Sequence, residues 1–381
     1  MKILTVDVGT GTQDILLYNP DLDAENSLKM VLPAPTMIFR RKIQMATQTR
    51  QPVLLTGVIM GGGPVAWAVE DHIKAGLRVF ATENAALSFH DHLERVQEMG
   101  VTLVSEDEAA RLKSTCLTLE LCDFDYHRIQ NTLQDFGISL DDLAAVAVSV
   151  FDHGAAPVGI SDRQFRFDYL ASQLQINSCL ETFSFPADQI PHSMTRMQAV
   201  SQSARTIPAP LILMDSAPAA ILGAMFDPAV KRFQQNLLVN IGNFHTLAFR
   251  MNRDKIEGVF EHHTGLLNQL SLEQYLRDFA SGNLSHEAVF SDHGHGALIM
   301  AEEPLQINQK DFNLIVTGPR RNLLKNSPLR PHFAVPFGDM MIAGCFGLLA
   351  ATAHWLPEIR PAILKGLDAS QSSGTAPWDI T

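Results

Sequence analysis

The fold is decided by the stretch Ile3-Leu4-Thr5-Val6-Asp7-Val8-Gly9-Thr10-Gly11-Thr12-Gln13-Asp14-Ile15-Leu16-Leu17-Tyr18. Two apolar runs flank a turn of glycine and threonine, which predicts a strand, a tight turn and a second strand. Because glycine lets the backbone approach a ligand closely, the turn can offer its N–H groups and two hydroxyls to an anion. Asp7 lies where it could hold Mg²⁺. An ordinary hairpin, whose glycines serve only the turn, is the alternative interpretation.

A second hairpin of the same kind lies in the other half of the chain. Asn236–Ile241 and Leu247–Arg250 read as strands, and a turn beginning at Gly242 joins them. Helices rich in small residues are predicted from Asp215 and from Gly338, one to close each half. Between residues 52 and 104, apolar strands alternate with helical patterns, which indicates an inserted βαβ region. The sequence therefore predicts an α/β protein with two duplicated lobes.

Composition narrows the classes of partner. The 381 residues carry a formal net charge of −12 and no large basic face, so nucleic-acid binding is not expected. The longest apolar run, residues 340–353, is too short to cross a membrane. No signal-peptide pattern follows Met1, and the four cysteines show neither disulfide nor zinc spacing. A cytoplasmic location is the expectation.

The motifs together resemble the actin / sugar kinase / Hsp70 ATPase superfamily. Val6–Thr12 is similar to its first phosphate motif, Val239–Thr246 to its second and Val316–Arg320 to its adenosine motif. The helices from Asp215 and Gly338 resemble its two connecting motifs. More narrowly, the chain resembles a prokaryotic family labelled as pyruvate formate-lyase activating enzymes. The cysteines do not support that label, because a radical enzyme of this kind needs a tight three-cysteine loop for its iron–sulfur cluster.

The resemblance implies two ribonuclease-H-like lobes with mixed sheets flanked by helices, which close on Mg-ATP in a cleft between them. We expect a first lobe over residues 1–214, a connecting helix over 215–235, a second lobe over 236–337 and a closing helix over 338–367. The last residues, 368–381, are expected to form a disordered tail. The residues that the resemblance assigns to ATP are Gly9, Thr10, Gly11, Thr12, Asn240, Gly242, Asn243, Thr246, Thr317, Gly318 and Arg320, with Asp7 as metal ligand and catalytic residue.

Two positions depart from the superfamily pattern. The second phosphate motif usually begins with aspartate, and this chain has Asn240, which can donate a hydrogen bond but cannot act as a base. The adenosine motif usually has two glycines, and here Pro319 follows Gly318. Either change could mean weak turnover of ATP, a different nucleotide or a lost activity.

Carboxylates and imidazoles follow several predicted strands, a composition typical of acid–base pairs and transition-metal sites. Asp152, at the end of an apolar strand, is the candidate general base. The candidates for a second substrate or a metal are His153, Glu261, His262, His263 and His293. The alternative is that these residues make ordinary surface hydrogen bonds. His90 and His92 are expected on two faces of a surface helix spanning residues 84–99.

Gly61-Gly62-Gly63-Pro64 follows a predicted strand and precedes a helix, which formally matches a dinucleotide-binding loop. Three hypotheses therefore stand. The leading one is a Mg-ATP-dependent phosphotransferase or ATPase that acts on a small metabolite or on water. The second is a non-catalytic nucleotide sensor or activator read by a protein partner. The third is a dinucleotide-dependent oxidoreductase that uses the Gly61 loop.

Overall fold

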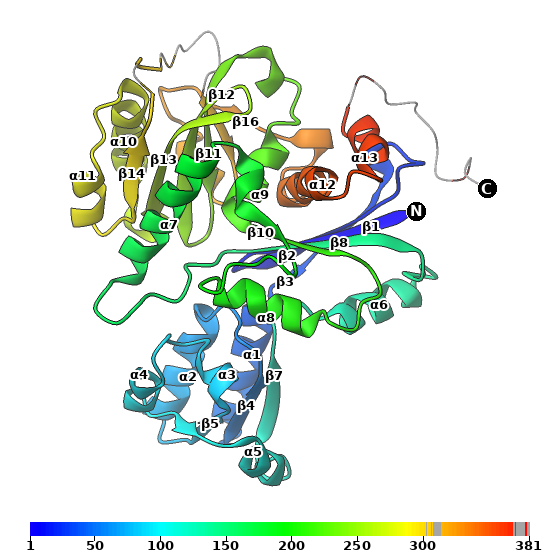
Figure 1. Cartoon of the computed structure of the whole chain (residues 1–381). Coiled ribbons are helices and arrows are strands. Elements are labelled where there is room, and N and C mark those ends of the chain that lie inside the picture. The colour runs from blue at the N-terminus through cyan, green and yellow to red at the C-terminus, as the bar shows by residue number, and fades with distance from the viewer. Residues whose placement is uncertain (302, 306, 308–313, 369, 371–377, 379–381) are drawn as a thin grey trace.

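The structure is a computed structural model that describes the whole chain except residues 302, 306, 308–313, 369, 371–377 and 379–381. The chain folds into three sheets with helices packed on their faces (Figure 1). The predicted α/β fold with two duplicated lobes is confirmed by the strand order of the two larger sheets. Most of the tail expected to be disordered, residues 368–381, lies outside the described residues.

The first sheet contains the opening hairpin. Its strands are β1 (Lys2–Val8), β2 (Thr12–Tyr18), β3 (Leu28–Pro33), β8 (Leu143–Val150), β9 (Ser184–Pro186) and β10 (Leu211–Asp215). They are ordered β3-β2-β1-β8-β10-β9. The β1–β2 and β2–β3 pairs are antiparallel, whereas β1–β8 and β8–β10 are parallel. Strand β8 is buried along most of its length, as its apolar sequence predicts for a central parallel strand.

The second sheet repeats this arrangement. Its strands are β11 (Gln235–Ile241), β12 (His245–Asn252), β13 (Lys255–His263), β14 (Gly296–Ile299), β15 (Leu314–Thr317) and β16 (His332–Phe333). The order β13-β12-β11-β15-β16 corresponds to β3-β2-β1-β8-β10, with the same parallel and antiparallel pairs, and β14 adds an edge strand. This order, with an antiparallel hairpin beside parallel strands, is the ribonuclease-H-like arrangement that the resemblance implies.

The duplication extends to single hydrogen bonds. In the β1–β2 turn, the Gly9 N–H donates to the Thr12 carbonyl over 2.9 Å. In the β11–β12 turn, the Gly242 N–H donates to the His245 carbonyl, also over 2.9 Å. The fourth position of the turn is therefore a threonine in the first lobe and a histidine in the second.

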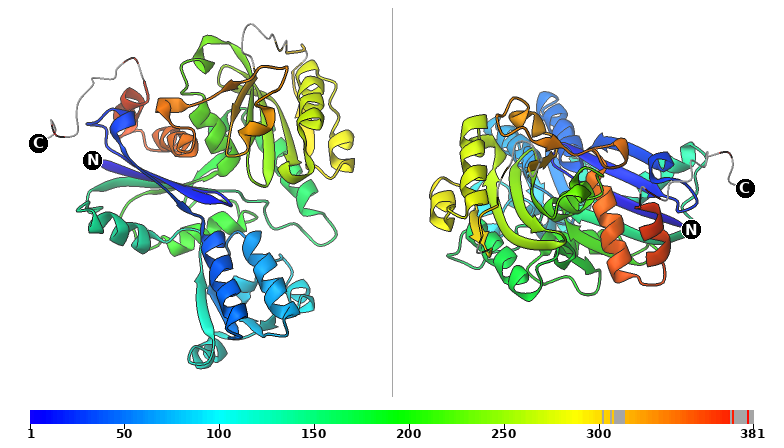
Figure 2. Two further views of the ribbon diagram at one scale, coloured as in Figure 1. Left: turned by 180° about the vertical axis from the view of Figure 1, so that it is seen from behind. Right: turned by 90° about the horizontal axis from the view of Figure 1, so that it is seen from above.

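Helices α9 (Ser216–Ala224) and α12 (Ala343–Trp355) pack against each other between the two larger sheets, as the views in Figure 2 show. Both are almost entirely buried, and one continuous core joins them to apolar residues of both sheets. Their small residues permit a close crossing: a Cβ on Gly223 would collide with the Ala343 carbonyl oxygen, and one on Gly347 with that of Ala219.

The inserted region forms the third sheet, between β3 and β8 in sequence. Its strands are all parallel and lie in the order β6-β5-β4-β7, with bounds β4 (Val53–Gly57), β5 (Val79–Ala81), β6 (Thr102–Leu103) and β7 (Leu117–Leu121). The helices are α1 (Pro35–Gln48), α2 (Pro64–Lys74), α3 (Glu83–Ala86), α4 (Leu93–Glu98) and α5 (Glu106–Leu112). Figure 1 shows this region projecting from the rest of the chain.

One predicted helix of the insert is wrong. The expected helix over residues 84–99 is interrupted, because α3 ends after one turn and α4 begins only at Leu93. His90 and His92 lie on the connecting loop with their ring centroids 5.4 Å apart, and His90 lines the cavity described below rather than a helix surface.

The remaining helices cover the sheets. They are α6 (Tyr126–Asp135), α7 (Asp162–Ile176), α8 (Thr195–Ser203), α10 (Gln269–Ser281), α11 (His286–Ser291) and α13 (Arg360–Gly366). Helix α7 reaches from the first lobe towards β14 of the second. In the described part of the chain, every helix falls short of the length and apolar character that a membrane span requires.

Candidate functional site

A cavity of about 480 Å³ lies where the three sheets meet. Both hairpin turns, the loop after β15 and the loops of the insert contribute to its walls. Most of the predicted site residues therefore lie around one space. Those that line it are Asp7, Gly9, Thr10, Thr12, Asp152, His153, Asn240, Gly242, Asn243, Thr317 and Gly318.

The tips of the two turns meet across this cavity. A Cβ on Gly11 would lie 2.8 Å from Nδ2 of Asn243, so the absence of a side chain lets the two tips approach. Phe244 of the second turn also packs edge-on against Trp67 of α2, with ring centroids 5.7 Å apart. The second turn thus contacts both the first turn and the insert.

Two carboxylates face each other at the base of the first turn. The hairpin register pairs Asp7 with Asp14. Oδ1 of Asp7 accepts hydrogen bonds from the hydroxyls of Ser149 and Ser216 at 2.6 and 2.7 Å, whereas the buried Oδ1 of Asp14 has no partner. Burial raises the pKa of both carboxyls, and together with the Asp7 charge it raises the pKa of Asp14 to about 8. A cation bound between the two would relieve this repulsion.

The loop after β15 approaches the second turn closely. Gly318 has a φ of 97°, and a Cβ there would lie 2.5 Å from Oδ1 of Asn240 and 2.6 Å from the Ile241 carbonyl oxygen. Only glycine fits this contact. Pro319 lines the cavity as the next residue, whereas Arg320 is exposed and does not line it.

Asp152, the predicted general base, lies at the cavity wall directly after β8. Its side chain is buried, and its two carboxylate oxygens accept backbone N–H groups of Gly154 and Met197, each at 2.9 Å. Burial raises its pKa, which these two hydrogen bonds partly oppose. The carboxylate therefore holds two loops together, and its role as a base stays a prediction.

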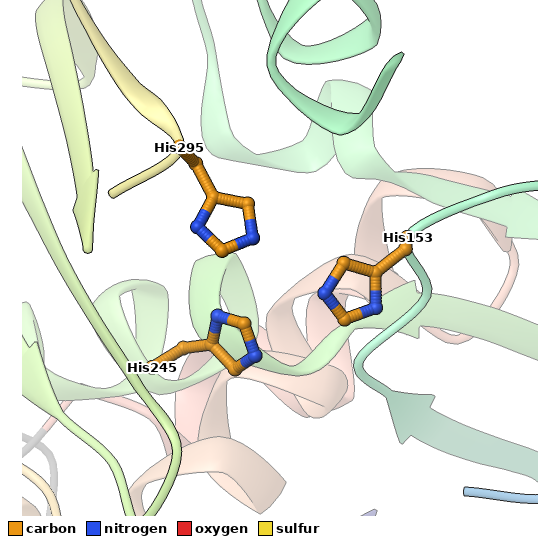
Figure 3. Close-up of side chains that lie close together, drawn as sticks. All are labelled: His153, His245 and His295. Carbon is orange, nitrogen blue, oxygen red and sulfur yellow. The ribbon is translucent and has the colours of Figure 1, made fainter. Parts of the chain in front are cut away.

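Three histidines converge at the same wall. Each of His153, His245 and His295 offers one ring nitrogen, and these nitrogens lie within 4.8 Å of one another (Figure 3). His153 comes from the loop after β8, His245 begins β12, and His295 directly precedes β14. Burial lowers the pKa of His153 well below its usual range and that of His295 to about 3, so both rings are neutral in the folded chain.

A buried ionic network lies behind this cluster. Arg166 of α7 is fully buried and forms ion pairs with Asp215 and with Glu261 of β13. Burial alone would raise the pKa of Glu261, but the guanidinium of Arg166 helps to hold it well below its usual range. Glu261 Oε1 lies 3.2 Å from Nδ1 of His245 and 3.6 Å from Nε2 of His295. The predicted Glu261 thus lies behind the histidines rather than at the cavity surface.

Other predicted residues lie elsewhere. Thr246 is buried, and its hydroxyl pairs with that of Thr264 at 2.9 Å, because alternation along β12 turns it away from the face that His245 occupies. His262 is buried against Tyr275, with ring centroids 5.4 Å apart. The last two predicted histidines are His263 and His293. The ring of His263 is half-buried beside the three-histidine cluster, whereas His293 is exposed.

The Gly61 loop follows β4 and opens α2, as a dinucleotide loop would, and it lines the cavity. Its anion-binding position is already used, because the Gly61 N–H donates to both carboxylate oxygens of Asp123 at 3.2 Å. Asp123 in turn is held by Arg196 at 2.6 and 3.0 Å. Glu83, which follows the next strand β5, is exposed at the start of α3 and does not line the cavity. This geometry gives the oxidoreductase hypothesis no support.

Sequence reasoning missed three residues of the site. Asp14 could have been found from the hairpin register, which places it opposite Asp7. His245 could have been found by aligning the two turns, since it occupies the position of Thr12. His295 carries no local signal, because only the pairing of β13 with β14 brings it to the cluster.

Residues 60–323, more than half of the chain, match the family described as "Putative pyruvate format-lyase activating enzyme (DUF1786)". The chain belongs to this family. No curated protein matches it. The ligand set for an iron–sulfur cluster does not fit: the described residues include all four cysteines, and the one group of three or more metal-ligating residues among them is the histidine cluster.

Several solved structures are distantly similar. The ethanolamine utilization protein EutJ from Carboxydothermus hydrogenoformans is 11% identical with a TM-score of 0.31, over 91% of this chain and 89% of that one. A propionate kinase from Francisella tularensis is 8% identical with a TM-score of 0.25, over 95% and 80%. The ROK hexokinase from Thermus thermophilus is 11% identical with a TM-score of 0.24, over 99% and 90%.

Proposed function

We propose that the chain binds a magnesium–nucleotide, with ATP as the expected ligand, and is a phosphotransferase or ATPase. The observation that carries the proposal is the pair of glycine turns, which share one hydrogen-bond pattern, approach each other at their tips and line one cavity. Backbone N–H groups from two facing turns can spread the charge of a polyphosphate. The loop of Thr317 and Gly318 lines the same cavity, where the resemblance expects adenosine.

Magnesium would be held at Asp7 and Asp14. Carboxylate oxygens are the ligands that Mg²⁺ prefers, and these two side chains both line the cavity beside the first turn. The unpartnered Oδ1 of Asp14 is the kind of buried oxygen that a cation would satisfy. When bound, the ion would neutralise the phosphates; the chain's own residues would fix the position of the nucleotide.

The insert supplies the part of the cavity that a second substrate would occupy. Its loops contribute Gly61, Gly62 and Gly63, together with His90 and Asp91. These groups are polar and suit a small hydroxylated or carboxylated metabolite. Without such an acceptor, water would take the phosphoryl group and the chain would act as an ATPase.

A second candidate function is a nucleotide sensor without turnover, in which ATP closes the cleft and a protein partner reads the closure. Two observations favour it. Asn240 stands where a carboxylate would be expected in the second turn, and both oxygens of Asp152 already accept backbone hydrogen bonds. Sensor and enzyme differ in whether phosphate leaves ATP.

The test is calorimetric titration of the full chain with ATP, with and without Mg²⁺. We expect Mg²⁺-dependent binding, and Asp7→Asn should weaken it about 10- to 100-fold because a charged ligand of the ion is lost. The matched control is Asp21→Asn, an exposed carboxylate remote from the cavity. Wild-type affinity in Asp7→Asn, or no binding by the wild type, would overturn the proposal.

A further inference from the structure

The three-histidine cluster has features that an ordinary hydrogen-bonded cluster lacks. His295 is fully buried, yet neither of its ring nitrogens makes a hydrogen bond. A buried polar group left unsatisfied costs about 1–3 kcal/mol. A bound ligand is one way to satisfy such a group, and the other two imidazoles converge on the same point (Figure 3).

Neighbouring side chains hold the ring of His245 in the way that histidine ligands are held at metal centres. Glu261 engages Nδ1 of His245 at 3.2 Å, which leaves Nε2 of that ring free for a ligand. A carboxylate behind a histidine is the usual arrangement at metal centres, because it fixes the ring and strengthens it as a donor. The stacking of Phe151 on His245, with centroids 4.1 Å apart, holds the same ring from the side.

The charge behind the cluster also suits a cation. Arg166 carries one positive charge, but it is paired with the two carboxylates Asp215 and Glu261. The formal charge of these three paired groups is therefore −1. A divalent ion at the histidines would face a net negative environment in spite of the nearby guanidinium.

We propose that His153, His245 and His295 form a binding site for a divalent transition metal of the zinc class, with an open coordination position towards the cavity. Imidazole nitrogen selects such metals over Mg²⁺, which prefers oxygen. Three protein ligands with a free fourth position are typical of sites where the metal also contacts water or substrate. His153 and His245 line the cavity, so that position would take water or an anionic oxygen of a ligand there.

The three imidazole rings must move slightly closer together to bind a zinc ion. Tetrahedral zinc with bonds of about 2.0–2.1 Å needs nitrogens about 3.4 Å apart, and the three nitrogens lie within 4.8 Å of one another. His153 can make this movement, because it lies on a loop and is only half-buried, whereas the other two rings are held by β12 and by the strand β14.

The experiment is titration of the metal-stripped full chain with Zn²⁺ by calorimetry, in excess Mg²⁺ and without nucleotide. We expect one Zn²⁺ per chain with a Kd below about 1 μM, and a tetrahedral visible spectrum when Co²⁺ replaces Zn²⁺. His295→Ala and His153→Ala should each weaken binding at least about 100-fold, and Glu261→Gln about 10- to 100-fold with the stoichiometry kept.

The matched control is His293→Ala, an exposed histidine two residues from His295, which should bind Zn²⁺ as the wild type does. If the buried His295→Ala fails to fold, as its circular dichroism will report, His153→Ala decides the result. Absence of one-to-one binding, or wild-type affinity in His153→Ala, would overturn the proposal. Because no nucleotide is present, this result is independent of whether the cavity binds ATP.

Discussion

Asp152 is the residue whose surroundings fit two roles. It lies at the cavity wall, where a base would have to lie, but it also joins the backbones of Gly154 and Met197. Asp152→Asn keeps the size of the side chain and removes its basicity. We expect ATP affinity to stay within about threefold and turnover to fall about 10²- to 10⁴-fold, the usual contribution of a general base.

The measurement is phosphate release or transfer, with calorimetric ATP affinity beside it. Thermal unfolding serves as the control for stability. In the variant, one of the two backbone N–H groups faces the NH2 group of the asparagine, which cannot accept its hydrogen bond. Unchanged turnover would remove Asp152 from the mechanism. A wild type that binds ATP and releases no phosphate would favour the sensor.

At the residue scale, the sequence predicted cavity residues that the local chain identifies and missed residues that strand pairing brings to the site. Asp7 and the glycines of both turns were predicted because their neighbours along the chain identify them. Asp14 and His295 were missed because strand pairing alone brings each to its partners. Thr246 was assigned to the ligand for a related reason: a shift of one residue along a strand turns a side chain to the other face.

At the scale of elements, the crossing of α9 and α12 depends on glycine. Gly347→Ala would place a methyl group against the Ala219 carbonyl oxygen and force the two helices apart. We expect the free energy of unfolding to fall by about 1–3 kcal/mol or more, as in other overpacked cores. Urea denaturation measures this change. Gly265→Ala is the control, since a Cβ there meets no atom within 4 Å, and it should change stability by less than about 0.5 kcal/mol.

A second element, α2 of the insert, carries a buried histidine. His72 is fully buried, and burial lowers its pKa from the usual value of about 6.5. Below pH 6.5 the folded chain therefore binds fewer protons than the unfolded chain, so the contribution of His72 to stability is present above that pH and is lost as pH falls.

His72→Gln removes this titration and keeps a polar group near Thr47, whose hydroxyl lies 2.8 Å from the His72 ring. We expect the wild type to lose more unfolding free energy than the variant between pH 7 and pH 5. Urea denaturation at both pH values measures it, and the exposed His354→Gln is the control. An equal loss in both proteins would contradict the expectation.

The elements were predicted best where pattern and length agreed. The apolar strand β8 and the small-residue helices α9 and α12 were read directly from composition. The predicted helix over residues 84–99 was wrong because a helical pattern of apolar residues continues across the loop between α3 and α4. Phe89 packs against the core of the insert from this loop, and Leu93 does so from the start of α4. Sequence periodicity cannot separate those two cases.

At the scale of the whole molecule, the side chain of Phe244 in the second lobe packs against the insert. Phe244 packs on Trp67, and a Cβ on Gly63 would lie 2.8 Å from its ring. Phe244→Ala should loosen this contact and increase hydrogen exchange at residues 61–67, while exchange in β1 stays unchanged. Phe136→Ala, which removes a ring that is 78% exposed, is the control. Equal protection of residues 61–67 in Phe244→Ala and the wild type would contradict it.

The repeated hairpin also has an evolutionary consequence. A chain that carries the same turn twice, with the Gly9–Thr12 and Gly242–His245 hydrogen bonds alike, contains two copies of one unit that can be compared position by position. One copy can keep a hydroxyl at a given position while the other copy carries a different side chain there on the same backbone. The two copies differ at their fourth position, where the first has the hydroxyl of Thr12 and the second the imidazole of His245, so one repeated backbone carries two different chemical groups.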